Sequence, residues 1–366
     1  MYERNYGLDL LRITAMFMVL LLHILGQGGI LKALPPPETK IHFSKFAAAW
    51  LVEIFAYCAV NCYAILTGYN YFGKAIKFAK IMIFWLQVLF YTTGISLIFW
   101  LSGNNIPKNI WLASLLPVTY GVYWYVTAYF GLFLLMPILN QGLVGVDRQK
   151  LKRYMIILFV FVSVLPTLFM KDPYILNRGY SLIWLLLLFL LGGAIRKLDV
   201  VNNVSSVFAM KMFFTSVIFT WIWKIAFDIL TKYIALKINP ANIFIKYTSP
   251  TIIFSGVFLF ILFAKIKVSN ERFKNLIKFF APAAFGIYLI HLHPLIWKGI
   301  FRGFSAGFIK SHVLMMLAKI LLSAILIYLS CTLIEIIRIK LFHYLKVEEK
   351  IQDVCNKMIN IYGNRT

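Results

Sequence analysis

The feature that most constrains this chain is a series of ten apolar runs, which together take up most of its 366 residues. A helix needs about 20 mostly apolar residues in a row to cross the roughly 30 Å hydrocarbon core of a bilayer. Hydrophobic residues make up 61% of the chain and charged residues 14%, whereas soluble domains have about 45–50% and about 25%. The sequence therefore predicts an all-α polytopic transmembrane helical bundle rather than a soluble enzyme. We place the ten spans at about 8–31, 46–72, 80–101, 122–140, 154–170, 181–195, 207–230, 249–266, 279–300 and 313–336.

Lysine and arginine are spread unevenly over the connections between these runs. With the N-terminus inside, the inner segments hold 21 of them and the outer segments 11. Because these residues collect on the cytoplasmic side of membrane proteins, the bias predicts that both termini are cytoplasmic, as an even number of spans requires. It also accounts for the net charge of +24. No segment is long enough for a basic soluble domain, so we expect no nucleic-acid partner.

The chain is predicted to consist of an integral-membrane domain, residues 1–340, and a short cytoplasmic tail, residues 341–366. The tail alternates charged and apolar residues at helical spacing, which indicates an amphipathic helix on the inner membrane face. The segment 111–121 contains Pro117 and Gly121 and is expected to form an interfacial half-turn. The cysteines show no metal-ligand spacing, so no metal site is predicted. The loops are short, and the chemistry must lie within the membrane body or at its edges.

The first span carries three ionisable residues, Asp9, Arg12 and His23, at depths where burying a charge costs a few kcal/mol or more. Arg12 and His23 are eleven positions apart, which puts them within roughly 20° of one helix face and about 16 Å apart. An anion-binding guanidinium near the cytoplasmic edge and an imidazole base in the outer half suit a group-transfer enzyme. Asp9 can hold the guanidinium in place. The alternative is an interfacial ion pair and a hydrogen-bonded core histidine.

Two carboxylates are candidate partners for these residues. Glu53 is about 10 Å below the outer surface and His23 about 22 Å above the inner one, so their depths are similar. We expect Glu53 to orient His23 or to stabilise its charged form. Glu335 falls near the inner surface, at the level of Arg12, and is a second candidate partner for that guanidinium.

Two histidines lie near the end of the ninth span, His291 and His293. They are about 200° apart on a helix and cannot line one cavity together. One of them is therefore expected to be structural.

Four stretches, in order along the chain, carry recognisable motifs. GLDLLRITAMFMVLLLH supplies Asp-x-x-Arg and Arg-x10-His through Asp9, Arg12 and His23, and AVNCYAILTGYNYF places Thr67-Gly68 where a Ser-Gly pair is usual. VYWYVTAYFGLFLLMPILN contains Trp124, Tyr125 and Pro137 in a Trp-Tyr…Pro arrangement. FGIYLIHLHPLI has a Tyr-Leu-x-His element ending at His291, and a Ser…Glu element closes on Glu335. Together these stretches resemble the integral-membrane acyltransferase-3 family, and within it the bacterial surface-polysaccharide O-acyltransferase branch.

The chain departs from the family pattern after the second span. The family tends to have an arginine-rich run before a proline there, whereas this chain has Lys74, Lys77 and Lys80, with Phe84 and no proline. The positive charge for a CoA phosphate is kept, but a guanidinium contact is not carried over. Thr67 in place of serine keeps a hydroxyl.

The resemblance implies acyl transfer, most often of acetyl, from cytoplasmic acyl-CoA to a hydroxyl of an extracytoplasmic glycan or lipid-linked sugar. It implies a multi-pass protein of a bacterial plasma membrane, surrounded by membrane lipid, with acetyl-CoA as a co-substrate and no permanently bound cofactor. His23 would deprotonate the acceptor or carry the acyl group in passing. The other expected site residues are Arg12, Lys74, Lys77, Lys80, Thr67 and Glu335 for the donor, His291 in the polar path, and Trp124 and Tyr125 for the sugar.

Other interpretations fit parts of the same pattern. Trp124 and Tyr125 are also typical of an aromatic belt at the membrane surface. A transporter or flippase for lipid-linked sugars would explain ten spans and a polar path, although paired discontinuous helices and internal symmetry are not visible in the sequence. A subunit without chemistry would not need Arg12 and His23 on one face. Release of free CoA distinguishes the enzyme from the transporter.

Overall fold

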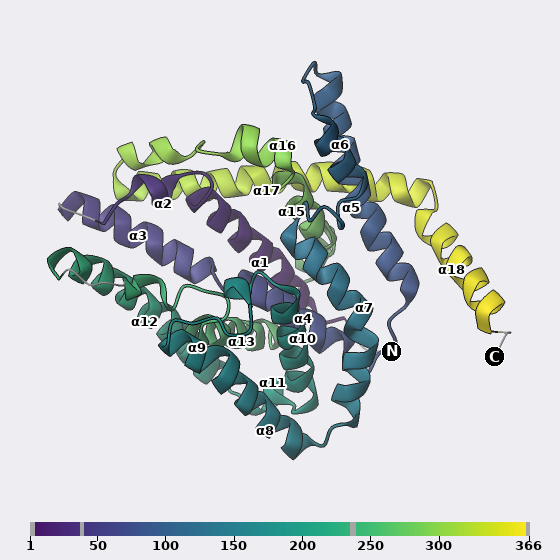
Figure 1. The fold of residues 1–366 in the computed structure, drawn as a ribbon, viewed down its shortest axis with the longest axis horizontal. Helices are drawn as coiled ribbons and strands as arrows, with labels where there is room; N and C mark the ends of the chain where they lie inside the picture. Colours follow the sequence, from purple (N-terminus) through teal and green to yellow (C-terminus); the bar gives the residue numbers. More distant parts are fainter. Residues whose placement is uncertain (1–3, 37–39, 235–238, 364–366) are drawn as a thin grey trace.

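The chain folds into an all-α bundle, as the sequence predicts. The computed structural model describes residues 4–36, 40–234 and 239–363; helices make up 79% of the structure and the described part contains no strand. Figure 1 shows the arrangement of the helices. In chain order they are α1 (Tyr6–Leu25), α2 (Ile30–Ala33), α3 (Lys40–Ala56), α4 (Ala59–Tyr71), α5 (Phe78–Leu101), α6 (Lys108–Leu115), α7 (Trp124–Gly145), α8 (Arg148–Phe159), α9 (Leu165–Leu168), α10 (Leu182–Lys197), α11 (Val200–Asn203), α12 (Ser206–Tyr233), α13 (Pro250–Ala264), α14 (Glu271–Phe280), α15 (Ala284–His291), α16 (Pro294–Ile296), α17 (Val313–Tyr344) and α18 (Val347–Gly363).

Eight helical segments in the described part of the chain are long and apolar enough to cross a membrane. Two shorter helices, α10 and α13, occupy the predicted sixth and eighth spans with 16 and 15 residues. The outside of the bundle exposes large apolar side chains, among them Ile98 (62%), Leu333 (63%) and Ile337 (68%). Such a surface is unfavourable in water but matches acyl chains. The protein is therefore a multi-pass membrane protein.

Four of the predicted continuous spans are interrupted. The first, 8–31, turns at residues 26–29, between α1 and α2. The second breaks at Tyr57-Cys58, between α3 and α4, and the ninth turns after His291. Pro294 explains the turn after His291. A proline disfavours helical geometry at the residue before it, which here is His293, with ψ 132°. In the fifth span, Pro166 has no N–H for the carbonyl four residues earlier, and the preceding turn, Val160–Val164, is a π-helix.

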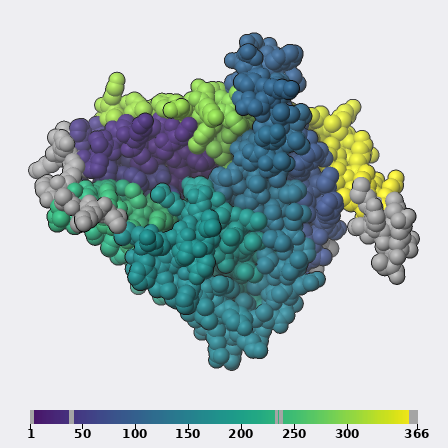
Figure 2. Space-filling model, in the orientation of Figure 1, coloured from purple at the N-terminus to yellow at the C-terminus, as the bar shows by residue number. Residues whose placement is uncertain are grey.

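The C-terminal part of the chain differs in detail from the prediction. Helix α17 continues through Tyr344, so the predicted boundary between 340 and 341 falls inside it. The expected tail helix is α18, which packs against α5; residues 364–366 lie outside the described residues. Segment 111–121 is not only a half-turn, because α6 continues to Leu115 before the turns. The end of α5 and α6 project from the body of the molecule (Figure 2).

Helix α1 lies at the centre of the bundle and contacts α3, α4, α13 and α17. It runs antiparallel to α17, since Phe17 lies against Tyr328 with ring centroids 6.3 Å apart, while the Ser305 hydroxyl, shortly before α17 begins, donates to the Ile24 carbonyl. The start of α1 and the end of α17 therefore lie at the same end of the bundle (Figure 1), an arrangement compatible with an even number of spans.

Helices α4 and α10 approach each other at backbone distance. A Cβ atom on Gly68 would lie 2.0 Å from the Phe189 carbonyl oxygen, and one on Gly192 would lie 2.1 Å from that of Ile65. Small residues at such crossings let transmembrane helices pack closely without a hydrophobic driving force. This contact fixes the last turn of α4 beside the last turn of α10, where two of the cavities described below meet the protein surface.

Candidate active site

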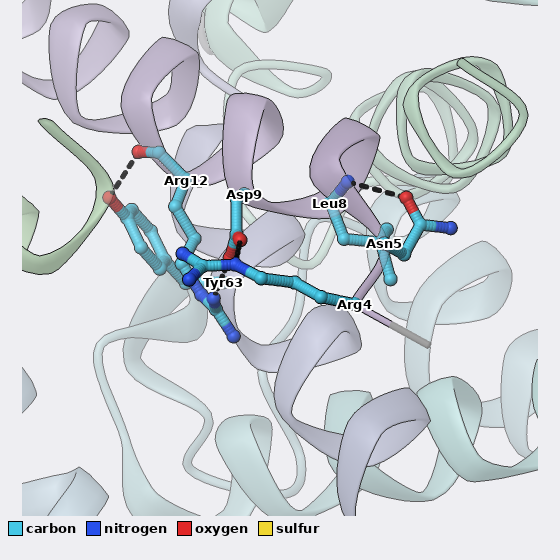
Figure 3. A network of polar contacts seen from close by, with 6 residues as sticks. All are labelled: Arg4, Asn5, Leu8, Asp9, Arg12 and Tyr63. Carbon is cyan, nitrogen blue, oxygen red and sulfur yellow. Dashed lines mark hydrogen bonds and ion pairs between the residues drawn. The ribbon is translucent and has the colours of Figure 1, made fainter. Parts of the chain in front are cut away.

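A charged cluster forms at the start of α1 (Figure 3). Asn5 caps the helix by accepting a hydrogen bond from the Leu8 N–H. Asp9, which is buried, accepts hydrogen bonds from two guanidinium groups: Arg4 Nε at 2.5 Å and Arg12 Nη1. The expected Asp9–Arg12 pair is therefore present, and Arg4 adds a second cation that the sequence analysis did not single out. Two cations on one carboxylate leave the cluster with net positive charge, which suits an anionic ligand.

A cavity of about 420 Å³ extends from this cluster into the bundle. Arg4, Asp9 and Arg12 form its polar end, and Val19, about 10 Å further along α1, is also in its wall. Thr67 lines it as well, and its hydroxyl donates to the Tyr63 carbonyl at 2.9 Å. We call it the Arg12 cavity. The aromatic residues of its wall include Tyr63, Phe84, Tyr125, Tyr129, Phe285 and Tyr288.

The two histidines expected at the site lie together although 268 positions separate them in sequence. His23 Nδ1 and His291 Nε2 are 2.8 Å apart. His291 Nδ1 lies 2.5 Å from the Ile287 carbonyl oxygen, which can only accept, so this nitrogen carries the proton. Nε2 of neutral His291 is then an acceptor, and Nδ1–H of His23 donates to it. Neutral His23 therefore holds its lone pair on Nε2, the arrangement that a general base requires.

Aromatic residues surround this histidine pair. The Trp297 ring meets His23 edge-on at 4.9 Å between centroids, and Phe301 lies 5.9 Å from His291. His23 remains half-buried. The pair is outside the wall of the Arg12 cavity, which ends one helical turn below it at Val19 and at Tyr288, whose ring is 6.2 Å from that of His291.

His293 does not join this pair. Its Nε2–H donates to the Thr92 carbonyl oxygen at 3.2 Å, and its Nδ1 caps α16 by accepting from the Leu295 N–H. The two neighbouring histidines thus have different partners, because the chain turns between them after α15 ends.

Neither expected carboxylate partner makes its predicted contact. Glu335 is fully buried and ion-pairs with Arg338 at 2.6 Å, while Gln87 and Tyr91 donate to it. Glu335 is not paired with Arg12, because Arg338, three residues later on the same helix, is its ion-pair partner. Glu53 lies beside Tyr57 and Tyr247, and the structure describes no hydrogen bond between it and His23. The acceptor of the His23 proton is His291 instead.

The three lysines expected to bind the donor do not form one group in the structure. Lys74, Lys77 and Lys80 are exposed and lie outside the Arg12 cavity; Lys74 lines a separate basic cavity, and Lys80 lies over the Tyr71 ring.

Trp124 and Tyr125, at the start of α7, point to different surroundings. Tyr125 lines the Arg12 cavity, whereas the Trp124 ring lies 4.7 Å from that of Tyr180 and stacks at 6.4 Å on Tyr247. The expected pair of sugar-stacking residues is therefore split.

One polar residue of the site was missed at the sequence level. The Tyr288 hydroxyl is buried, lines the Arg12 cavity and has no described hydrogen-bond partner. Leaving a buried hydroxyl unpaired costs about 1–3 kcal/mol, so such a group is a candidate for a ligand contact. The sequence could have indicated Tyr288, because Tyr288 and His291 are the ends of the Tyr-Leu-x-His element. Their i,i+3 spacing places both on one helix face.

The fold and this site define a multi-pass membrane protein with a charged, aromatic-walled cavity leading towards a hydrogen-bonded histidine pair. A family profile described as an acyltransferase domain (Acyl_transf_3) matches residues 5–336. The chain belongs to this acyltransferase family and is a membrane acyltransferase. No curated protein and no solved structure matches the chain. The matched range contains Asp9, Arg12, His23 and His291.

Proposed function

We propose that this acyltransferase moves an acyl group, expected to be acetyl, from cytoplasmic acyl-CoA to a hydroxyl of an extracytoplasmic glycan or lipid-linked sugar in a bacterial plasma membrane. The observation that carries the proposal is the hydrogen-bonded chain from the Ile287 carbonyl through His291 to His23. It leaves a basic nitrogen one turn beyond a cavity that begins at Arg12. Family membership favours this enzyme over the transporter or flippase.

The Arg12 cavity suits the acyl-bearing arm of the donor. Its charged end, formed by Arg4 and Arg12, attracts an anionic or strongly polar group, and its aromatic wall accepts an uncharged chain. The thioester would then lie at the end of the cavity that is farthest from Arg12, near Tyr288 and one helical turn from His23.

In the direct route of transfer, His23 is the general base that accepts the proton of the acceptor hydroxyl. Nε2 takes the proton of the acceptor hydroxyl while its oxygen attacks the thioester carbonyl carbon. The C–S bond then breaks, and the departing CoA thiolate takes the proton back from the imidazolium. In the alternative route, Nε2 itself attacks the thioester carbon and the C–S bond breaks, which gives an acyl-imidazolium and the CoA thiolate. The acceptor hydroxyl then attacks the acyl carbon, the C–N bond breaks, and the hydroxyl proton passes to the thiolate. In both routes His291 holds the ring so that Nε2 faces the reacting groups.

The experiment that tests this function uses the purified full chain in nanodiscs. Incubation with acetyl-CoA, with and without candidate glycans and lipid-linked sugars, is followed by free thiol release and by mass spectrometry of the acceptor. Thiol release coupled to an acetylated acceptor supports the proposal. If a folded protein releases no thiol from acetyl-CoA or longer acyl-CoAs under any of these conditions, the assignment of the donor is wrong.

We expect Tyr288→Phe to lower kcat by about 10²-fold, with little change in KM. The hydroxyl is the group placed to donate to the thioester carbonyl oxygen, and removing one such donor typically costs about 10²–10³-fold. The fold should tolerate the change, because that hydroxyl has no described partner to lose. Tyr328→Phe is the matched control, since its hydroxyl is also buried and unpartnered but outside the cavity wall. Equal kcat in both variants would remove Tyr288 from the reaction.

A further inference from the structure

A second, basic cavity of about 360 Å³ opens beside the ends of α4 and α10 and the start of α8. Four cationic residues line it, Lys74, Arg148, Arg196 and Lys197, and no carboxylate is among its described lining residues. We call it the basic cavity. Four positive charges around one cavity attract an anionic ligand.

The walls of the basic cavity are held by specific contacts. Asn140 of α7 accepts from the Gly73 N–H at 3.0 Å and donates to the Lys74 carbonyl at 2.9 Å, which fixes the loop after α4. Gly73 itself has φ +70°, a conformation that favours glycine. Lys197 donates to the Leu143 carbonyl at the end of α7. These bonds join the loop after α4 and the end of α10 to α7.

The cationic groups of the cavity are fixed in a similar way. The Arg196 guanidinium lies over the Tyr69 ring, 4.7 Å from its centroid. Arg148 is the first residue of α8, and the nearby carboxylate of Asp147 is used to cap that helix by accepting from the Gln149 and Lys150 N–H groups. Asp147 lies outside the cavity wall, although its charge also acts on Lys197, one of the four cations.

The basic cavity and the Arg12 cavity share a lining residue. Asn70, in the last turn of α4, belongs to both walls. The two cavities therefore adjoin at Asn70, and one elongated ligand that occupied both would pass this residue. Its part in the basic cavity must be anionic, and its part in the Arg12 cavity must be slender and largely uncharged beyond Arg12.

We propose that the basic cavity binds the ribose phosphate and pyrophosphate of the acyl-CoA nucleotide, while the pantetheine arm passes Asn70 into the Arg12 cavity. This inference rests on the proposed function. Phosphate groups form their strongest contacts with guanidinium groups, which bind two oxygens at once, so Arg148 and Arg196 are the principal ligands and Lys74 adds charge. Of the three lysines expected to bind the CoA phosphates, only Lys74 lines the basic cavity. Two arginines from other helices, Arg148 and Arg196, line it as well.

The test compares two donors that differ only in the nucleotide. S-acetyl-CoA and S-acetyl-pantetheine carry the same thioester, so their KM values are measured for the wild type, Arg148→Ala and Arg196→Ala in nanodiscs. Each variant should raise the KM for acetyl-CoA about tenfold, as expected for a lost hydrogen bond to a charged group, and leave that for acetyl-pantetheine unchanged. Arg153→Ala, a cation on the same helix outside the cavity wall, is the control and should match the wild type.

Binding of adenosine 3′,5′-bisphosphate, measured by calorimetry, tests the cavity without turnover. Saturable binding that weakens about tenfold in Arg148→Ala and Arg196→Ala, but not in Arg153→Ala, supports the proposal. If the wild type uses both donors with equal KM, or the variants bind the bisphosphate as well as the wild type, the nucleotide site is wrong while the acyltransfer proposal stands. If the bisphosphate binds as expected but no thiol is released from any donor, the proposed function fails and the anion site stands.

Discussion

Replacing His23 by alanine is expected to lower acyl transfer by about 10²- to 10⁴-fold, the range that a positioned general base contributes. The reason is geometric: His23 Nδ1 is 2.8 Å from His291 Nε2, so the free lone pair is on the opposite nitrogen. The measurement is kcat for acceptor acetylation in nanodiscs. Thermal unfolding should show a folded variant, because His23 is only half-buried.

Two further variants test whether the loss of activity comes from the role of His23 as a base. His291→Phe removes the acceptor of the Nδ1 proton, so the His23 ring loses its fixed tautomer, and activity should fall although His23 is intact. His293→Asn is the control: asparagine can still cap α16, and that histidine contacts Thr92 rather than His23. If His23→Ala keeps more than a third of the wild-type kcat, His23 is a core residue and not the base.

The same variants separate the two routes for the acyl group. With radiolabelled acetyl-CoA and no acceptor, an acyl-carrier route leaves label on the wild-type protein that hydroxylamine removes and that His23→Ala lacks. A direct route leaves none, and its initial rates fit a ternary complex rather than a ping-pong pattern.

Much of the architecture was accessible from the sequence because membrane spans are set by local composition. Each of the ten predicted runs contains a helix, and the Asp9–Arg12 pair follows from i,i+3 spacing on one helix. The tail helix likewise follows from its own alternation of charged and apolar residues. These features depend on neighbours in the chain, which a sequence shows directly.

The remaining features depend on which helices meet. The sequence placed His23 and Glu53 at similar depth, but depth does not fix the direction of a side chain, and α1 directs His23 towards α15 instead. The break at Tyr57-Cys58 has no proline or glycine to mark it. The basic cavity joins residues from α4, α8 and α10, whose common position follows from the close contact of α4 with α10 and from loops clamped by other helices.

The second large effect that we expect is a loss of stability in Gly68→Ala and Gly192→Ala, because α4 and α10 are in backbone contact at these glycines. A single added methyl group would lie 2.0 Å from the Phe189 carbonyl oxygen or 2.1 Å from that of Ile65. Backbone atoms cannot rotate away as a side chain can, so α4 and α10 must separate. Overpacking a close-packed interior costs roughly 1–3 kcal/mol and occasionally more, and we expect values at or above the top of that range.

The measurement is the temperature at which the detergent-solubilised protein loses its main peak in gel filtration. Gly94→Ala and Gly142→Ala are the controls, since each places the same methyl group inside a helix with nothing within 4 Å. Both should unfold at or above the wild-type temperature, because alanine favours helix by about 1 kcal/mol over glycine. Equal stability of all four variants would contradict the backbone contact between α4 and α10.

Helix separation should also reach the donor site, since Tyr69 and Asn70 directly follow Gly68 and Arg196 lies one turn after Gly192. Below the unfolding temperature, either variant should therefore raise the KM for acetyl-CoA more than that for acetyl-pantetheine. Gly94→Ala should leave the ratio of the two values as in the wild type. Unfolding without any change in that ratio would mean that α4 and α10 stabilise the bundle but do not set the geometry of the basic cavity.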